Sequence, residues 1–421
     1  MDIFLFVVFL AVAFTAATHD IAIDGYYLEA LDEKDQSRFV GTRATAYRIA
    51  MLVVSGPLVL FIGHFGWTAG FAVATVAMGG LGLWHARYLP RVETAERPIS
   101  ALARQIAAFH LKAPQVPQAH ELGTPQAVMA PVLQNFEQIR PLLSDPADLQ
   151  QLDALQAWAE TSFARLEPVL ARRKAEGFIR ECHGDIHLGN VTLLDGQVTL
   201  FDCIEFNEPF RLIDIASDAA FLAMDLEDRG LKCLARRFVS AWLEHTGDYA
   251  AVELLNFYKA YRAMVRGKVA LFRLGQEQDA VQRAVIQRQY RRYASLAESY
   301  SAIPSRFLAI THGVSAVGKS HVAMRLVEAL GTIRLRSDIE RKRLFGEQSA
   351  ETKDQLTAGI YSTDASQATY QRLHQLARQT LLAGFPVVID ATYLKAAQRQ
   401  AASEIARAEG RRNGARDKLA E

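Results

Sequence analysis

The most informative segment of the chain is a glycine-containing run that reads Gly313-Val314-Ser315-Ala316-Val317-Gly318-Lys319-Ser320. It fits the pattern G-x-x-x-x-G-K-[ST], which forms a loop around phosphate groups. The short apolar stretch 307–311 before it predicts a buried strand. Residues 321–330 after it are apolar at helical spacing and end at Gly331. This order of strand, glycine loop and helix predicts an α/β domain with a parallel sheet.

The residue types of this segment suit an anion. Gly313 and Gly318 let the backbone turn sharply and approach a phosphate group. The N–H groups of the loop and the helix N-terminus then present positive charge. We expect Lys319 to reach the β- and γ-phosphates of ATP and the Ser320 hydroxyl to ligate Mg²⁺. With Ser315, these residues form the predicted nucleotide site.

Composition sets broad limits on the function. The chain has 421 residues and a net charge of +1, so length predicts two or three domains. The nearly neutral charge argues against a nucleic-acid-binding surface over the whole protein. Cys182, Cys203 and Cys233 have neither metal-site spacing nor an even count, which is typical of reduced cysteines in the cytosol.

The first 92 residues are far more apolar than the rest. Runs at 3–18, 49–63 and 66–86 each approach the roughly 20 residues that cross a bilayer. They predict about three transmembrane helices in residues 1–92. A signal peptide is the alternative for the first run, and a buried helical hairpin is the alternative for the other two.

Basic residues give the expected orientation of these helices. They cluster between the first and second runs and again after the third: Lys34, Arg38, Arg43, Arg48, Arg87, Arg91, Arg97 and Arg104. The positive-inside rule then places the 20–48 loop and everything after about residue 90 in the cytoplasm.

A resemblance supports a membrane location. Residues 17–26 and 43–48 resemble a middle piece of a major-facilitator permease of the muropeptide-transporter type. The resemblance covers about the first 90 residues and implies a location in the bacterial inner membrane. It also leaves open a second hypothesis, in which the protein is a membrane transport component.

The middle of the chain carries a second pattern, which reads His183-Gly184-Asp185-Ile186-His187-Leu188-Gly189-Asn190. Residues 191–202 then predict a hairpin that turns at Asp195-Gly196 and ends at Asp202. Phosphoryl transfer needs a carboxylate that orients the acceptor hydroxyl, together with oxygen ligands for Mg²⁺. Asp185 is the candidate catalytic carboxylate, and Asn190 and Asp202 are candidate metal ligands.

This second pattern resembles the aminoglycoside/choline-kinase-like phosphotransferases. Together with the glycine loop, residues from about 95 to 410 resemble bacterial fusions of such a domain to a P-loop, AAA-type ATP-binding kinase domain. The resemblance implies a mostly α-helical kinase-like C-terminal lobe in 93–300, with Asp214 fixing the fold beneath the loop. We expect the N-terminal lobe of that family to be missing, because membrane-like sequence occupies its place. Lys259, Arg262 and Arg266 form either a phosphate site or a solvated helix face.

The last region, 301–421, resembles small-molecule P-loop kinases. A second predicted strand leads into Asp338, which the resemblance makes the candidate catalytic base; a helix-capping role is the alternative. A later buried strand ends at Asp390, which suits a Mg²⁺ site that acts through water. The chain becomes polar after Lys395, so we expect this domain to stop before its lid.

These patterns together predict a Mg²⁺-dependent, ATP-binding phosphotransferase that acts on a small-molecule hydroxyl and is tethered to a membrane. The predicted fold class is α/β with N-terminal transmembrane helices. The alternative is a truncated or recombined chain without catalytic activity.

Overall fold

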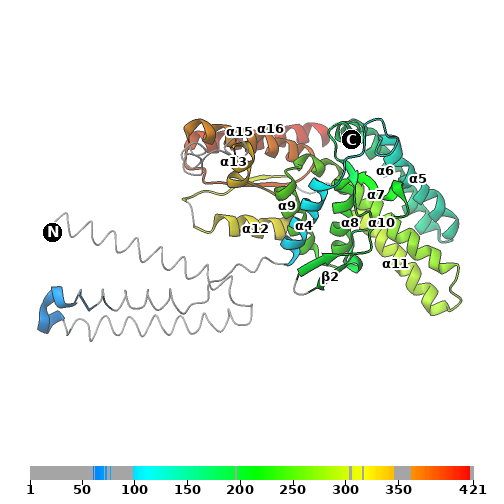
Figure 1. The fold of residues 1–421 in the computed structure, drawn as a ribbon, viewed down its shortest axis with the longest axis horizontal. Helices are drawn as coiled ribbons and strands as arrows, with labels where there is room; N and C mark the ends of the chain where they lie inside the picture. The colour runs from blue at the N-terminus through cyan, green and yellow to red at the C-terminus, as the bar shows by residue number, and fades with distance from the viewer. Residues whose placement is uncertain are drawn as a thin grey trace. The chain divides into compact units, whose positions relative to one another are not determined.

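The computed structural model describes residues 60, 62–70, 72–73, 76, 98–194, 197–302, 306–314, 317–345 and 362–417. The chain divides into two compact units, Met1–Arg97 and Pro98–Glu421 (Figure 1). The second unit holds a helical part, which runs from α4 to α11, and a sheet part, which runs from β5 to α16.

The structure corrects the prediction of transmembrane helices in residues 1–92. The run 3–18 lies outside the described residues, as does most of the other two runs. The described helical residues of this unit include Gly66, whose φ of +83° interrupts a regular α-helix. No helix in the described part of the chain is long and apolar enough to cross a membrane. The fold class with N-terminal transmembrane helices and the inner-membrane location are therefore wrong.

The helical part confirms the expectation of a mostly α-helical region. Its long helices are α4 (Pro98–Lys112), α5 (Pro125–Ile139), α6 (Pro146–Ala175), α8 (Ile215–Asp228), α9 (Lys232–Thr246), α10 (Val252–Leu274) and α11 (Ala280–Ser299). Shorter turns are η2 (Arg140–Leu142), η3 (Leu188–Asn190), α7 (Glu208–Arg211) and η4 (Tyr249–Ala251). Helix α8 is buried on every side from Ile215 to Leu226, as a helix at the centre of a bundle must be. Helices α9, α10 and α11 pack against α8, and α4 packs against α9 (Figure 1).

Two antiparallel strand pairs lie within the helical part. Strand β1 (Ile179–Glu181) pairs with β4 (Leu212–Asp214), and β2 (Val191–Leu194) pairs with β3 (Gln197–Leu200). The second pair is the predicted hairpin, although its turn at residues 195–196 lies outside the described residues. The segment between β1 and β2 contains η3 and the pattern at residues 183–190, which we call the acidic pattern.

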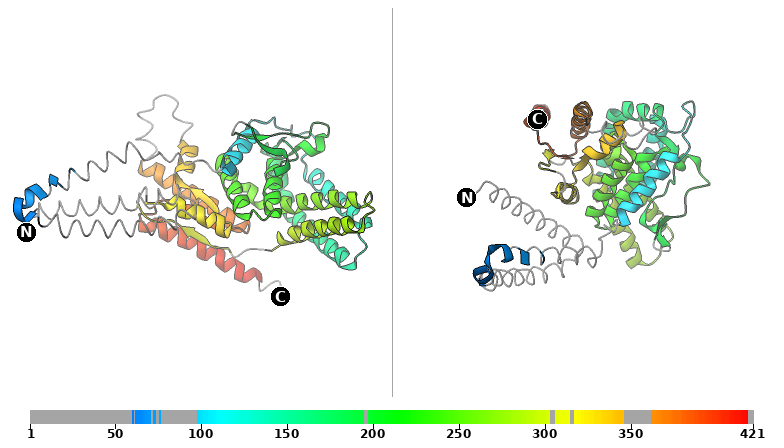
Figure 2. Two further views of the ribbon diagram at one scale, coloured as in Figure 1. Left: turned by 90° about the horizontal axis from the view of Figure 1, so that it is seen from below. Right: turned by 60° about the vertical axis from the view of Figure 1, so that its left-hand side comes forward.

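The sheet part contains three parallel strands in the order β5-β7-β6. They are β5 (Leu308–Ile310), β6 (Ile333–Arg336) and β7 (Val387–Asp390), and the helices around them are α12 (Lys319–Leu330), α13 (Ser337–Phe345), α15 (Thr363–Leu382) and α16 (Ala396–Asp417). Successive side chains of the central strand point to opposite faces. Val388 packs on α12, whereas Val387 and Ile389 belong to the core on the other face with α15. Helices α12 and α15 cover the two faces of this sheet (Figures 1 and 2). The predicted α/β arrangement with a parallel sheet is confirmed.

Candidate functional site

The glycine loop turns at the carboxyl end of β5 and leads into α12. Gly313 and Gly318 have φ values of +128° and +83°, and residues other than glycine rarely adopt this backbone conformation. Gly318 is the N-cap residue, so Lys319 and Ser320 begin the helix. The Lys319 Nζ atom donates to the Val314 carbonyl and therefore lies against the loop. Ser315, predicted to bind the nucleotide, lies outside the described residues.

A buried carboxylate lies at the same edge of the sheet. Asp390 ends the central strand β7, and the Gly313 N–H donates to the Thr392 carbonyl two residues further on (3.1 Å). Asp390 is only 5% exposed, and its Oδ2 atom has no hydrogen-bond partner among the residues that the structure describes. Because a buried carboxylate oxygen without a partner is costly, this atom fits a role in holding a hydrated cation.

Asp338 lies at the end of the neighbouring strand. It is the second residue of α13, which follows β6 directly, and Arg336 of β6 is in register with Asp390 of β7. The Asp338 side chain is 52% exposed and accepts a hydrogen bond from Arg336 Nη2 (2.9 Å). Asp338, Asp390 and the glycine loop thus follow the carboxyl ends of the three parallel strands, where α/β sheets bind their ligands.

The acidic pattern of the helical part forms a second cluster. The Asn190 Nδ2 atom donates to the Asp185 carbonyl (3.0 Å) and to Asp185 Oδ2 (3.2 Å). Asp202 has a φ of +61°, and both aspartates line one cavity of about 390 Å³. The structure therefore brings Asp185, Asn190 and Asp202 into one region.

Comparisons with known proteins agree with this division. Residues 69–255 match the phosphotransferase enzyme family, and residues 308–415 match an AAA domain. We call the two matched regions the phosphotransferase-family domain and the AAA domain. The resemblance of residues 1–90 to a permease is not supported, because the phosphotransferase-family match already begins inside the third apolar run.

Curated relatives share much of the chain. Uncharacterized proteins of Mycobacterium bovis and Mycobacterium tuberculosis are 31% identical to it over 322 residues, which is 74% of this chain. The chain spans 62% of the length of these relatives. No solved structure matches the chain.

A buried aspartate supports the loop of the phosphotransferase-family domain. Asp218 of α8 accepts hydrogen bonds from the backbone N–H groups of His183 (3.1 Å) and Gly184 (3.0 Å). Burial alone would raise the pKa of Asp218, but the hydrogen bond from His110 and the charge of Arg262 help to lower it. Asp218 therefore holds the loop as a carboxylate.

His110 connects this aspartate to two helices that are distant in sequence. The Trp242 Nε1–H group donates to His110 Nδ1 (3.1 Å), so the proton of the neutral imidazole is on Nε2, which faces Asp218 Oδ2 (3.1 Å). Cys182 lies in the same buried cluster. Its Sγ atom, a ring nitrogen of His110 and a carboxylate oxygen of Asp218 lie within 4.8 Å of one another. Both ring nitrogens of His110 are already hydrogen-bonded, which favours structural support of the loop over metal binding.

Arg262 of α10 is a second residue whose role the sequence did not reveal. It is buried, and its guanidinium donates to the Gly184 carbonyl (3.1 Å) and to Ser217 Oγ (3.2 Å). The solvated helix face considered for this residue is therefore wrong. Burial would raise the pKa of Asp185, but the hydrogen bond and charge of His187 and the charges of Arg262 and Arg266 outweigh it and lower the pKa.

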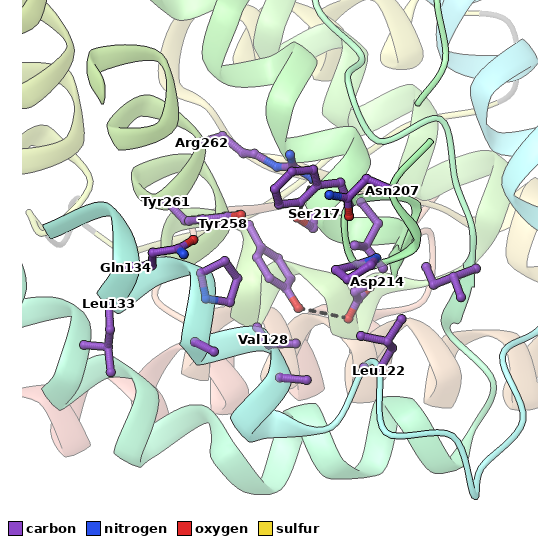
Figure 3. A pocket seen from close by; sticks show the side chains of 18 of the residues that line it. Leu122, Val128, Leu133, Gln134, Asn207, Asp214, Ser217, Tyr258, Tyr261 and Arg262 are labelled. Atoms are coloured by element: carbon purple, nitrogen blue, oxygen red, sulfur yellow. Dashed lines mark hydrogen bonds between the residues drawn. The ribbon is translucent and has the colours of Figure 1, made fainter. Parts of the chain in front are cut away.

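A larger cavity adjoins the one that Asp185 and Asp202 line. Figure 3 shows the side chains that line the larger cavity. It has a volume of about 740 Å³ and lies between α5, α10 and the segment around β4. Apolar side chains such as Leu122, Val128 and Leu133 dominate its walls, and Tyr258 donates to Asp214 Oδ2 (3.4 Å) within it. Five residues line both this cavity and the one at Asp185: Pro131, Gln134, Phe210, Tyr261 and Arg262.

Asp214 has a structural role beside the larger cavity. It caps α8 and accepts two hydrogen bonds from the fully buried Arg173, which also pairs with Asp248. This network fixes the wall of the larger cavity.

Proposed function

We propose that the protein is a Mg²⁺-dependent phosphotransferase that uses ATP and acts on a hydroxyl group of a small molecule. The nucleotide site of this proposal is the glycine loop of the AAA domain. One observation carries it: the glycine turn before α12 and the buried Asp390 lie at the same edge of the sheet. The Asp390 Oδ2 atom has no hydrogen-bond partner among the residues that the structure describes.

Each residue of the site has a distinct part in the proposal. The backbone N–H groups at the start of α12 and the Lys319 ammonium would bind the phosphates. Ser320 and Asp390 would hold Mg²⁺, whose charge neutralises the phosphate oxygens during transfer. Asp338 would orient the acceptor hydroxyl and take its proton. The exposure of Asp338 leaves it accessible to an acceptor from solvent.

The proposal predicts that Lys319→Ala weakens Mg²⁺–ATP binding. Charge-assisted hydrogen bonds contribute on the order of 1.5–3 kcal/mol, so the Kd should rise roughly ten- to hundredfold. Calorimetric titration of the full chain with Mg²⁺–ATP tests this, with Lys342→Ala of α13 as a control for the loss of one positive charge. Unchanged affinity in Lys319→Ala would show that the loop does not bind the phosphates.

Ser320→Ala should act through the metal instead. We expect its ATP affinity to fall about tenfold when Mg²⁺ is present, because the hydroxyl is a proposed metal ligand. In EDTA the variant and the wild type should bind ATP equally. A loss of affinity of the same size in EDTA would contradict the assignment of Ser320 as a metal ligand.

A second candidate reaction centre lies in the phosphotransferase-family domain. It is favoured by the shared lining of the two cavities, since an acceptor in the 740 Å³ cavity would lie next to the cavity that contains Asp185 and Asp202. In this alternative, Asp185 orients the hydroxyl, while Asn190 and Asp202 bind Mg²⁺.

A further inference from the structure

Helix α9 of the helical part contacts the C-terminal end of α12, the helix that follows the glycine loop. The Arg236 Nη1 atom donates to the carbonyls of Glu328 (2.8 Å) and Ala329 (2.7 Å). The last carbonyls of a helix lack partners within the helix, and a cation there is also favoured by the helix dipole. Arg237 adds an ion pair to the Glu328 side chain (3.1 Å). The far end of α12 is therefore fixed to α9.

The first turn of α12 is joined to the same helix through a buried ion pair. Glu244, near the end of α9, accepts a hydrogen bond from Arg334 Nε of β6 (2.7 Å). Both side chains are buried, with exposed fractions of 7% and 8%. The Arg334 Nη1 atom in turn donates to the Ser320 carbonyl (3.4 Å). Arg334 thus links Glu244 to Ser320, the proposed metal ligand.

The same carboxylate also reaches the proposed catalytic base. Arg336 Nη1 lies 3.7 Å from Glu244 Oε2, and Arg336 Nη2 donates to Asp338 Oδ2 (2.9 Å). Glu244 is therefore the common partner of two arginines. One of them contacts Ser320 and the other contacts Asp338.

We infer that Glu244 is a positioning residue for the nucleotide site of the other domain. Through Arg334 and Arg336 it holds the first turn of α12 and Asp338 in one arrangement, so the site is complete only while the sheet part is docked on α9. Buried ion pairs have well-defined geometry, and removal of one partner leaves an uncompensated charge that must rearrange. This inference rests on the proposed nucleotide site. It adds that phosphate binding in the AAA domain is coupled to the phosphotransferase-family domain.

The coupling is tested with Glu244→Gln in the full chain. The amide keeps the shape of the side chain but removes the charge that holds both arginines. We expect the Kd for Mg²⁺–ATP to rise about tenfold, within the usual range of coupling between sites, and the effect to shrink in EDTA because Ser320 acts through the metal. Glu244→Asp, which keeps the carboxylate, should lose less affinity.

Glu253→Gln is the matched control. Glu253 joins the same two parts, because its Oε1 atom accepts a hydrogen bond from Gln379 of α15 (3.4 Å). This contact involves α15 rather than β6 or α12, so the variant should bind Mg²⁺–ATP as the wild type does. Equal loss of affinity in Glu253→Gln and Glu244→Gln would overturn the specific role of Glu244.

The outcomes separate the inference from the function on which it rests. A folded wild type that does not bind Mg²⁺–ATP overturns both. Wild-type binding with unchanged affinity in Glu244→Gln overturns the inference alone.

A measurement on the wild type decides the question if Glu244→Gln does not fold. By thermodynamic reciprocity, Mg²⁺–ATP should slow hydrogen exchange at the backbone amides of both α12 and residues 240–246 of α9. Slower exchange in α12 with no change in α9 would overturn the coupling.

Discussion

Arg173→Ala is expected to lower the free energy of unfolding by about 3–5 kcal/mol, the range for removing one partner of a buried ion pair. Arg173 is fully buried, and its Nε and Nη2 atoms donate to Asp214 (2.7 and 2.8 Å). Its Nη1 and Nη2 atoms donate to Asp248 (2.8 and 2.7 Å). The variant would leave two carboxylates in the core without their cation.

Urea unfolding followed by circular dichroism measures this loss. Arg291→Ala is the control, because Arg291 pairs with Asp145 and Asp148 at the surface, where such pairs contribute less than about 1 kcal/mol. Equal losses in the two variants would contradict the buried network as a source of stability.

The loss in Arg173→Ala should also depend on pH. Burial already raises the pKa of Asp248 in spite of Arg173, and without this cation its pKa should rise further. A carboxyl whose pKa is raised in the folded state destabilises the fold above that pKa, and this penalty disappears below the pKa of the unfolded chain, about 3.9. The difference between variant and wild type should therefore shrink as the pH falls toward 4.

Asp338→Asn is expected to slow phosphoryl transfer about 100- to 10,000-fold, the usual contribution of a positioned acid or base. Affinity for Mg²⁺–ATP should change little, since the Asp338 side chain accepts its hydrogen bond from Arg336 of β6 and has no proposed part in phosphate binding. The measurement is ADP formation from Mg²⁺–ATP in the presence of a panel of sugars, amino alcohols and nucleosides. Calorimetric titration of the same variant separates loss of transfer from loss of binding.

Asp185→Asn is the counterpart that distinguishes the two reaction centres. We expect it to change ADP formation little, because the glycine loop and Lys319 that would hold the phosphates lie in the sheet part. A large loss in Asp185→Asn with full activity in Asp338→Asn would place the reaction in the phosphotransferase-family domain instead.

Sequence patterns predict those elements whose conformation is determined by residues close together in the chain. The glycine turn at Gly313 and Gly318, the helix after it and the strand that ends at Asp390 are all set by sequence within a few residues. The hairpin after Asn190 could be predicted for the same reason. The roles proposed for Asp185, Asp202 and Asp338 remain predictions.

Residues whose partners are distant could not be found in this way. Arg173 and Glu244 resemble ordinary helix-surface charges in the sequence, because their partners lie 41 to 92 residues away. The transmembrane prediction failed for a related reason. Apolar composition indicates burial but does not show whether a helix continues, and the described residues include a positive φ at Gly66.

The bonds that join His110 to Asp218 and Trp242 span 108 and 132 residues. Because a ribosome adds about 5–20 residues per second, α4 waits on the order of ten seconds for Trp242 to be synthesised. During this interval α4, whose Leu102 and Ile106 are buried in the finished protein, has no α9 to pack against. The nascent chain therefore exposes an apolar helix before its partner exists, and this is the stage at which we expect it to depend most on chaperones.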